Sequence, residues 1–357
     1  MARTLDTRQA NRLVSLFACL LPLSMAPTAH AATNAPQRPN ILFIYTDDQS
    51  YRTVSCYPEA YPWARTPNID RLADEGVRFG PVYIGTWCLP SRASLLTGLH
   101  PTGIRSLHSA GRYPGGTYDP AQCPFWPSVF RRHGYVTAQI GKWHTGNDTG
   151  YGRDWDLQVI LRSHLARDGD PLPSAWIDWV RRYHQSVRAL DEAVGKLLEA
   201  LEESGQRDNT LVVFTSDQGL AVGQHGFLDK HAPYDANIAT PLIVSMPGTL
   251  PQGKVCNRPV GGVDLVPTFF RVAGIDLPWK MHGRDLTPLL KNPQRDWPHP
   301  TLLIYTVGRF GDDTLHPPSP AKRPDRVPWY LLLRQGRYKY IRAGCVVGFV
   351  GGGWGLG

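Results

Sequence analysis

A cysteine and an arginine lie one helical turn apart in a segment, Gly85 to Gly98, that is typical of a loop leading into a helix. Pro90 suits the first helical turn, and Gly98 suits the left-handed position after the last one. Cys88 therefore lies just before a predicted helix N-terminus, where free N–H groups and the helix dipole favour an anion. Arg92 can bring its guanidinium back toward Cys88. This position suits a reactive cysteine and a buried structural one, and position alone leaves both open.

Acidic and amide side chains follow two apolar runs that predict buried strands. Asp47 and Asp48 follow the first run, and Asp217 and Gln218 follow the second. Adjacent carboxylates repel each other, so a buried pair needs a cation or a shared proton. A solvated turn is the simpler alternative for two aspartates after a strand. If both strands belong to one sheet, the four side chains meet at one edge, and oxygen ligands of this kind suit calcium or magnesium.

Basic residues follow the predicted strands in two further places. Lys142 and His144 are two positions apart, so both can face one pocket if the backbone there is extended. His225 and Lys230 belong to the segment that follows Asp217. These pairs are weak evidence alone, because the same residue types are common on protein surfaces. His225 could equally order its own loop.

The Cys-Leu-Pro-Ser-Arg string from Cys88 to Arg92, followed by Leu-Leu-Thr-Gly, resembles the signature of the type I, formylglycine-dependent sulfatases. This family belongs to the alkaline phosphatase superfamily. The Gly-Lys-Trp-His string at Lys142 and the Gly-x-His-Gly segment that leads to Lys230 are similar to further motifs of the family. The resemblance therefore covers the cysteine, both acidic pairs and both basic segments.

The resemblance implies a role for each of these residues. Cys88 would be oxidised to formylglycine by a formylglycine-generating enzyme, and the implied catalytic residues are Cys88, Arg92, Lys142, His144 and Lys230. In the family the first lysine binds sulfate, the histidine assists sulfate release, and the later lysine helps to protonate the leaving oxygen. One divalent cation, usually calcium and alternatively magnesium, would be held by Asp47, Asp48, Cys88, Asp217 and Gln218. His225 would bind substrate.

Two parts of the chain depart from the family pattern within a resemblance that runs from about Arg38 to Arg342. Residues between Tyr151 and Tyr183 are fewer than in relatives, and no strand ending in a sulfate-binding histidine is visible there. His164 is a poor substitute. The C-terminal lobe of the family is expected to be truncated to one hairpin, followed by a loose glycine-rich tail.

The order of predicted elements is alternating. Strands are expected at 40–46, 77–83, 136–140, 211–215 and 241–246. Helices are expected at 68–75, in the segment between Cys88 and Gly98, and at 126–133, 175–203 and 263–273. Strands that alternate with helices predict an α/β fold with a mostly parallel central sheet covered by helices on both faces. The resemblance makes this fold alkaline-phosphatase-like, with a truncated C-terminal small-sheet lobe. The predicted divisions are a signal peptide at 1–31, a catalytic domain at 32–327, and an incomplete lobe and disordered tail at 328–357.

The N-terminus is typical of a signal peptide. Three arginines precede a short apolar run that ends in Ala29-His30-Ala31, a small-x-small cleavage site. An uncleaved anchor is the alternative, and no later stretch is apolar enough to span a membrane. We therefore expect a periplasmic or secreted protein with no membrane association after cleavage. Five cysteines would remain, and Cys88 is the natural unpaired one in that odd set.

The net charge of +8 suits an anionic substrate, although it is also an ordinary surface property. No interleaved basic and aromatic patch indicates nucleic acid. We expect a sulfuric ester hydrolase that acts on a sulfated carbohydrate. A formylglycine-type phosphonate or phosphodiester hydrolase is the second possibility. The third is an inactive, truncated homologue that only binds sulfated glycans.

Overall fold

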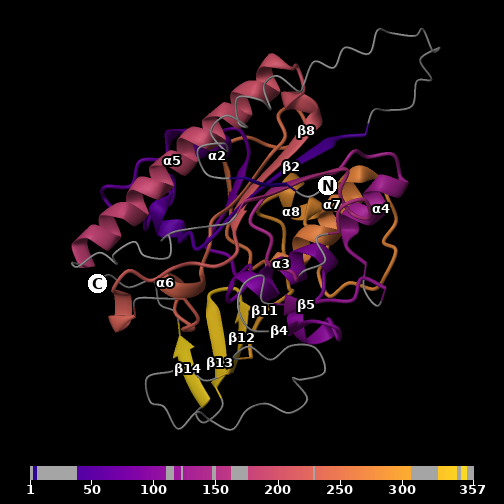
Figure 1. Ribbon diagram of the computed structural model, residues 1–357. Helices are drawn as coiled ribbons and strands as arrows, with labels where there is room; N and C mark the ends of the chain where they lie inside the picture. Colours follow the sequence, from indigo (N-terminus) through magenta and orange to yellow (C-terminus); the bar gives the residue numbers. More distant parts are fainter. Residues whose placement is uncertain are drawn as a thin grey trace, which may run out of the picture.

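A five-stranded sheet forms the centre of the molecule (Figure 1). The computed structural model describes residues 3–5, 38–109, 116–121, 124–146, 150–161, 176–227, 230–306, 329–343 and 347–351. In spatial order the strands of the central sheet are β10 (Lys254–Cys256), β3 (Val77–Phe79), β9 (Leu242–Ser245), β8 (Thr210–Ser216) and β2 (Asn40–Thr46). The five strands predicted from the sequence thus include four of these and omit β10.

Most strand pairs in the body of the protein are parallel. β2 runs parallel to β8, and β3 runs parallel to β10, whereas β9 is antiparallel to both of its neighbours. A second sheet, formed by β1 (Arg3–Leu5), β7 (Leu157–Leu161) and β6 (Ala138–Gly141), is parallel throughout. The mostly parallel sheet predicted from the sequence is confirmed, with β9 as the exception.

Helices cover both faces of the central sheet (Figure 1). Leu211 and Val213 of β8 pack on one side and Val212 and Phe214 on the other, because successive strand residues point to opposite faces. The first side is covered by α4 (Trp126–Arg132), α7 (Leu265–Ala273) and α8 (Thr287–Lys291), and the second by α2 (Pro67–Asp74) and α5 (Trp176–Glu203). The predicted α/β class is therefore confirmed.

The cysteine segment forms α3 (Cys88–Thr97). Trp87 is extended and caps the helix, so Cys88 is the first helical residue and not the residue before the helix. Gly98 adopts φ 72°, and its N–H bonds the Ser94 carbonyl, as expected for a left-handed helix end. β3 ends at Phe79, shorter than predicted, because Gly80 and Pro81 follow and proline lacks the N–H that a ladder needs.

The stretch between Tyr151 and Tyr183 contains a strand that the sequence analysis did not predict. β7 arises from a five-residue apolar-rich run and pairs with β6. Such short runs are ambiguous without knowledge of the partner strand. His164 follows β7 but lies outside the described residues.

A small antiparallel sheet follows the central body, in the order β11 (Thr301–Tyr305), β12 (Tyr330–Gln335), β13 (Tyr338–Ala343) and β14 (Val347–Gly351). The predicted hairpin corresponds to β12 and β13. The expectation of a lone hairpin with a loose tail is wrong for two segments, because β11 pairs with β12 and β14 pairs with β13. Residues of β14 form a strand because they pair with β13, despite the low strand propensity of glycine. Residues 352–357 lie outside the described part.

The small sheet is docked on the body by buried and charged contacts. Leu303, Tyr305, Tyr330 and Leu332 belong to the apolar cluster that includes Phe214 of β8. Elsewhere in this interface, Lys339 Nζ lies 2.7 Å from a carboxylate oxygen of Asp235 in α6 (Asp235–Ile238), and Arg334 donates to the Pro81 carbonyl at 2.7 Å. The hairpin therefore gains its stability from a larger partner.

Three cysteines lie in the described residues, and all are free: Cys56, Cys88 and Cys256. Cys123 and Cys345 lie outside them. The expectation that Cys88 is unpaired agrees with its free state in this structure. Among the helices of the described residues, none is both long and apolar enough to cross a bilayer.

Residues 3–5 of the predicted signal peptide form β1, and the cleavage of that peptide stays a prediction.

Candidate active site

The two acidic segments meet at the carboxyl ends of β2 and β8. The register pairs Thr46 with Ser216, so the residues after each strand emerge side by side. The backbone N–H of Asp48 donates to Asp217 Oδ1 at 2.9 Å, and the Gln218 amide donates to the Asp48 carboxylate. The contact between the two pairs that the sequence predicts is therefore present.

Asp48 has a strained backbone that a tyrosine from a distant helix supports. Its φ is 56°, which is uncommon for a residue with a side chain, and strain of this kind costs on the order of 1–3 kcal/mol. The Tyr183 hydroxyl donates to the Asp48 carbonyl at 2.9 Å and accepts from the Ser50 N–H at 3.1 Å. Tyr183 thus fixes the loop that presents Asp48.

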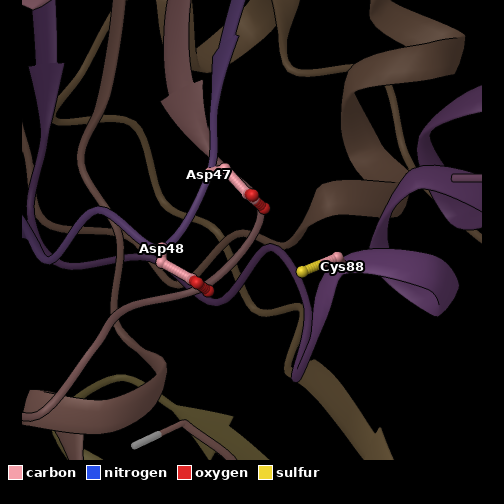
Figure 2. Close-up of side chains that lie close together, drawn as sticks. All are labelled: Asp47, Asp48 and Cys88. Carbon is pink, nitrogen blue, oxygen red and sulfur yellow. The ribbon is translucent and has the colours of Figure 1, made fainter. Parts of the chain in front are cut away.

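Cys88 points from the start of α3 into the space between Asp47 and Asp48 (Figure 2). One ligand atom of each of these three side chains lies within 4.8 Å of the other two. Lys230 Nζ lies 3.3 Å from Cys88 Sγ, and the Gln218 amide nitrogen lies 3.8 Å from it. The sulfur therefore has neighbours from three other segments of the chain.

Three cations neutralise the acidic cluster. Lys142 Nζ lies 2.6 Å from Asp47 Oδ2, and Lys230 Nζ lies 2.8 Å from Asp48 Oδ1. Arg92 Nη2 lies 3.5 Å from a carboxylate oxygen of Asp47 and 3.5 Å from one of Asp217. Three carboxylates and three cations leave the cluster near neutral, so a bound divalent cation would make it positive and suited to an anion.

The pKa values of Asp47 and Asp217 are shifted in opposite directions. Burial, a hydrogen bond with Asp47 and the charge of Asp47 raise the pKa of Asp217 well above its usual value. Burial also acts to raise the pKa of Asp47, but the hydrogen bond with Asp217 and the charges of Arg92 and Lys142 outweigh it and lower that pKa. Burial and the neighbouring carboxylate therefore both oppose ionisation of Asp217, and a bound cation would favour it.

The pKa values of Cys88 and His144 also differ from their usual values. Burial and the charges of Asp217 and Asp47 raise the pKa of Cys88 to about 12, so an unmodified thiol stays protonated at neutral pH. Burial and the charges of Lys142 and Arg92 lower the pKa of His144 to about 4. His144 is therefore neutral at neutral pH and able to accept a proton.

The donor set fits a hard divalent cation. Gln218 Oε1 is buried and accepts no hydrogen bond from any described residue. Asp47 Oδ1 is also buried without a hydrogen bond from the described residues, and Arg92 Nη2 is its ion-pair partner at 3.5 Å. Buried acceptors of this kind normally have a partner. Together with the carboxylates of Asp48 and Asp217, these oxygens match the ligands that calcium and magnesium prefer.

His225 stands apart from the cluster. Its exposed ring stacks on Tyr234 with 4.2 Å between ring centres, and its described contacts do not include the residues around Cys88. The structure thus brings together every other residue that the sequence predicts for the site, although His144 is placed there through the charges that act on it. The predicted contact of His225 with substrate is not supported by this position, which suits the loop-ordering alternative.

The sequence analysis did not predict two residues of the site, Tyr45 and Tyr183. Tyr45 lies under Arg92, with 5.0 Å from the guanidinium carbon to the ring centre. Its position two residues before Asp47 could have indicated it, because alternate strand residues share a face. Tyr183 has no comparable signal, since it reaches Asp48 from a helix far along the chain.

Tyr183→Phe is expected to destabilise the protein by about 1–3 kcal/mol, because the Ser50 N–H and the Asp48 carbonyl would lose their partner. Urea unfolding measures this change. Tyr338→Phe is the matched control, since Tyr338 is exposed in the small sheet and its hydroxyl accepts a hydrogen bond from the exposed Arg337. Equal stability of the two variants would contradict the anchoring role of Tyr183.

Comparisons with known proteins agree with this geometry. The family model described as Sulfatase matches residues 39–162 and 149–275. An N-acetylglucosamine-6-O-sulfatase of Bacteroides thetaiotaomicron is 26% identical, with 79% of this chain and 77% of the relative covered. Human arylsulfatase A is 27% identical, with 89% and 77% covered.

Solved structures show the same fold. A structure in complex with its substrate D-glucosamine-2-N,6-O-disulfate has a TM-score of 0.65 at 20% identity and covers 88% of this chain and 90% of its own. The phosphonate monoester hydrolase of Agrobacterium radiobacter has a TM-score of 0.68 at 18% identity, with 86% and 88% covered. At such identities the likeness shows the fold alone. The family model, however, covers most of the chain and matches the segments that form the cluster, so this protein belongs to the sulfatase family.

Proposed function

We propose that this protein hydrolyses sulfate esters of carbohydrates at the cluster around Cys88. One observation carries the proposal: Cys88 at a helix N-terminus faces Asp47 and Asp48, with Lys230 3.3 Å from its sulfur. A sulfate ester is an anion, and the cationic side chains and the helix start offset its repulsion from an attacking oxygen. Membership of the sulfatase family supports the same reaction.

The proposed reaction needs a modified residue, formylglycine, and a bound divalent cation. Formylglycine made from Cys88 by a formylglycine-generating enzyme supplies, as a hydrated aldehyde, one hydroxyl for attack on sulfur and a second that permits sulfate to leave. A divalent cation, calcium or magnesium, supplies positive charge to the sulfate oxygens. The residues that would hold it are Asp47, Asp48, Asp217, Gln218 and the modified Cys88.

The side chains of the chain have separate tasks in this proposal. Lys142 and Arg92 bind the sulfate oxygens, and Asp217 takes a proton from the attacking hydroxyl. Lys230 donates a proton to the leaving alcohol, because it is the ammonium group closest to Cys88 among the described contacts. His144, neutral at neutral pH, accepts the proton of the second hydroxyl.

The names of the relatives support a carbohydrate substrate. The sulfatases that the chain resembles are described as N-acetylglucosamine-6-O-sulfatase, N-acetylgalactosamine-6-sulfatase and ulvan-active sulfatase. The N-terminal sequence supports export, so we further propose a periplasmic or secreted location where such polymers occur.

Hydrolysis of paired model substrates tests the proposed reaction. A sample with Cys88 converted should release 4-nitrophenol from 4-nitrophenyl sulfate much faster than from bis(4-nitrophenyl) phosphate and phenylphosphonate 4-nitrophenyl ester. A preference for either phosphorus ester would favour the alternative of a phosphonate or phosphodiester hydrolase. No turnover of any ester by a converted, metal-loaded sample would favour the alternative of an inactive glycan-binding homologue.

A further inference from the structure

A groove of about 580 Å³ opens beside the N-terminal half of α5. Its walls include Tyr61 and Trp63 from the loop before α2, Trp176, Val180 and Arg181 from α5, and Val222 from the loop after β8. This volume is in the range of pockets that bind small molecules. The groove lies outside the cluster around Cys88 and has no part in the mechanism above.

Large aromatic rings are held in place while exposed in this groove. Trp63 is 57% exposed and Trp176 is 42% exposed. Trp63 stacks on Tyr61 with 5.2 Å between ring centres, and its Nε1 donates to His184 at 3.0 Å. Trp176 stacks on Trp179, also at 5.2 Å. Exposed aromatic surface that is fixed in this way is typical of a binding site.

The charge of the groove selects the kind of ligand. Among its described lining residues, the charged side chains other than histidine are Arg181 and Arg188, and no carboxylate lines it. Both arginines have acidic neighbours on α5, Asp178 and Glu192, but such exposed pairs are weak. Flat aromatic rings with two guanidinium groups suit a ligand with apolar C–H faces and several anionic groups.

The groove is joined to the catalytic cluster by shared elements. Tyr183 stacks on Trp179 at 5.8 Å, and its hydroxyl contacts the Asp48 carbonyl. The loop between Gln218 and Lys230 supplies Gln224, whose amide donates to the Tyr61 hydroxyl at 2.7 Å. A polymer whose sulfate is at Cys88 therefore has a neighbouring surface on which further residues can lie.

We propose that this groove, the α5 groove, binds the sugar rings next to the reacting one in a polyanionic, sulfated oligosaccharide. The inference rests on the proposed function, because it assigns a polymeric substrate to the same centre. Trp63 and Trp176 pack against the sugar rings, and Arg181 and Arg188 contact sulfate or carboxylate groups. A second copy of this chain, which could also cover the rings, is an alternative that the experiment separates.

Binding to Cys88→Ala protein tests the groove without turnover. Calorimetric titrations use hexasaccharides of chondroitin 6-sulfate, heparan sulfate and κ-carrageenan, each beside its desulfated form. The parent should bind at least one sulfated hexasaccharide, and Trp63→Ala or Trp176→Ala should weaken that binding about tenfold. Arg181→Gln should weaken it for the sulfated form and much less for the desulfated form.

Matched controls come from the same molecule. Arg182→Gln changes a neighbouring exposed arginine that does not line the groove, and Tyr338→Ala removes an exposed aromatic ring of the small sheet. Both should bind like the parent. Failure of the parent to bind any sulfated hexasaccharide, or equal binding by the groove variants, would overturn the proposal. A dimer in sedimentation experiments that Trp63→Ala dissociates would also overturn it.

The outcome for the proposed function is read separately. If the converted wild-type protein releases no sulfate from any ester while Cys88→Ala protein still binds in the groove, the reaction fails and the groove stands. If 4-nitrophenyl sulfate is hydrolysed while the hexasaccharides are not bound, the reaction stands and the groove fails. Trp176→Ala could instead lose 4-nitrophenyl sulfate turnover by as large a factor as hexasaccharide affinity. That result would show that Trp176 acts at the catalytic cluster, and it would overturn the proposed role of the α5 groove.

Discussion

Cys88→Ala protein is expected to release sulfate from 4-nitrophenyl sulfate more than about 10³-fold more slowly than the parent. Within the described cluster, Lys142 and Lys230 are ion-paired with Asp47 and Asp48, so Cys88 is the side chain best placed to supply a nucleophile. Ser91, on the same helix, donates its hydroxyl hydrogen to the Trp87 carbonyl at 2.7 Å instead. The free energy of unfolding should change by only about 1 kcal/mol, because a small side chain is removed.

Cys256→Ala is the matched control, since Cys256 is a second buried free cysteine, in the core at β10. It should keep turnover within about twofold of the parent. Mass spectrometry of the tryptic peptide Phe79–Arg92 provides a second, independent measurement. From a host with the formylglycine-generating enzyme, it should show an aldehyde or its hydrate at position 88. An unmodified thiol in an active sample, or full activity of Cys88→Ala, would contradict the proposed nucleophile.

Features that depend on local sequence were predicted well. The strand before Asp47 and the strand before Asp217 are apolar runs, and parallel pairing of β2 with β8 then brings the two acidic pairs together. The cysteine helix was predicted from Pro90 and Gly98, with an error of one position at Cys88. Local patterns fix where such elements begin and end within a residue or two.

Features that depend on distant partners were not predicted. β9 has the same apolar composition as a parallel strand, and its antiparallel direction follows from where the chain returns to the sheet. β14 contains glycines with low strand propensity and pairs because β13 offers an edge. Tyr183 reaches Asp48 only because α5 packs across that face of the sheet. The position of His225 likewise depends on Tyr234, which lies beyond the local motif.

Excess chelator is expected to lower the melting temperature of the metal-loaded protein by roughly 5 °C, besides stopping turnover. A cation held at about 100 times its dissociation constant stabilises the folded state by about 2.7 kcal/mol, which corresponds to a shift of this size in a domain of this length. The physical reason is that the converging oxygens of Asp47, Asp48, Asp217 and Gln218 would lose the ion that binds them together in the folded state and not in the unfolded one. Differential scanning calorimetry with EGTA and with EDTA measures the shift, and return of calcium or magnesium identifies the metal.

Asp217→Asn separates the cation site from a general effect of chelator. Asp217 is fully buried and touches Asp48 and Gln218 through its Oδ1. Its loss from the ligand set should make the melting temperature of the variant independent of chelator. Asp178→Asn, which changes an exposed carboxylate on α5, should respond to chelator like the parent. An Asp217→Asn protein that still loses stability in chelator, or a parent that does not, would place any bound cation elsewhere and remove the metal from the proposed mechanism.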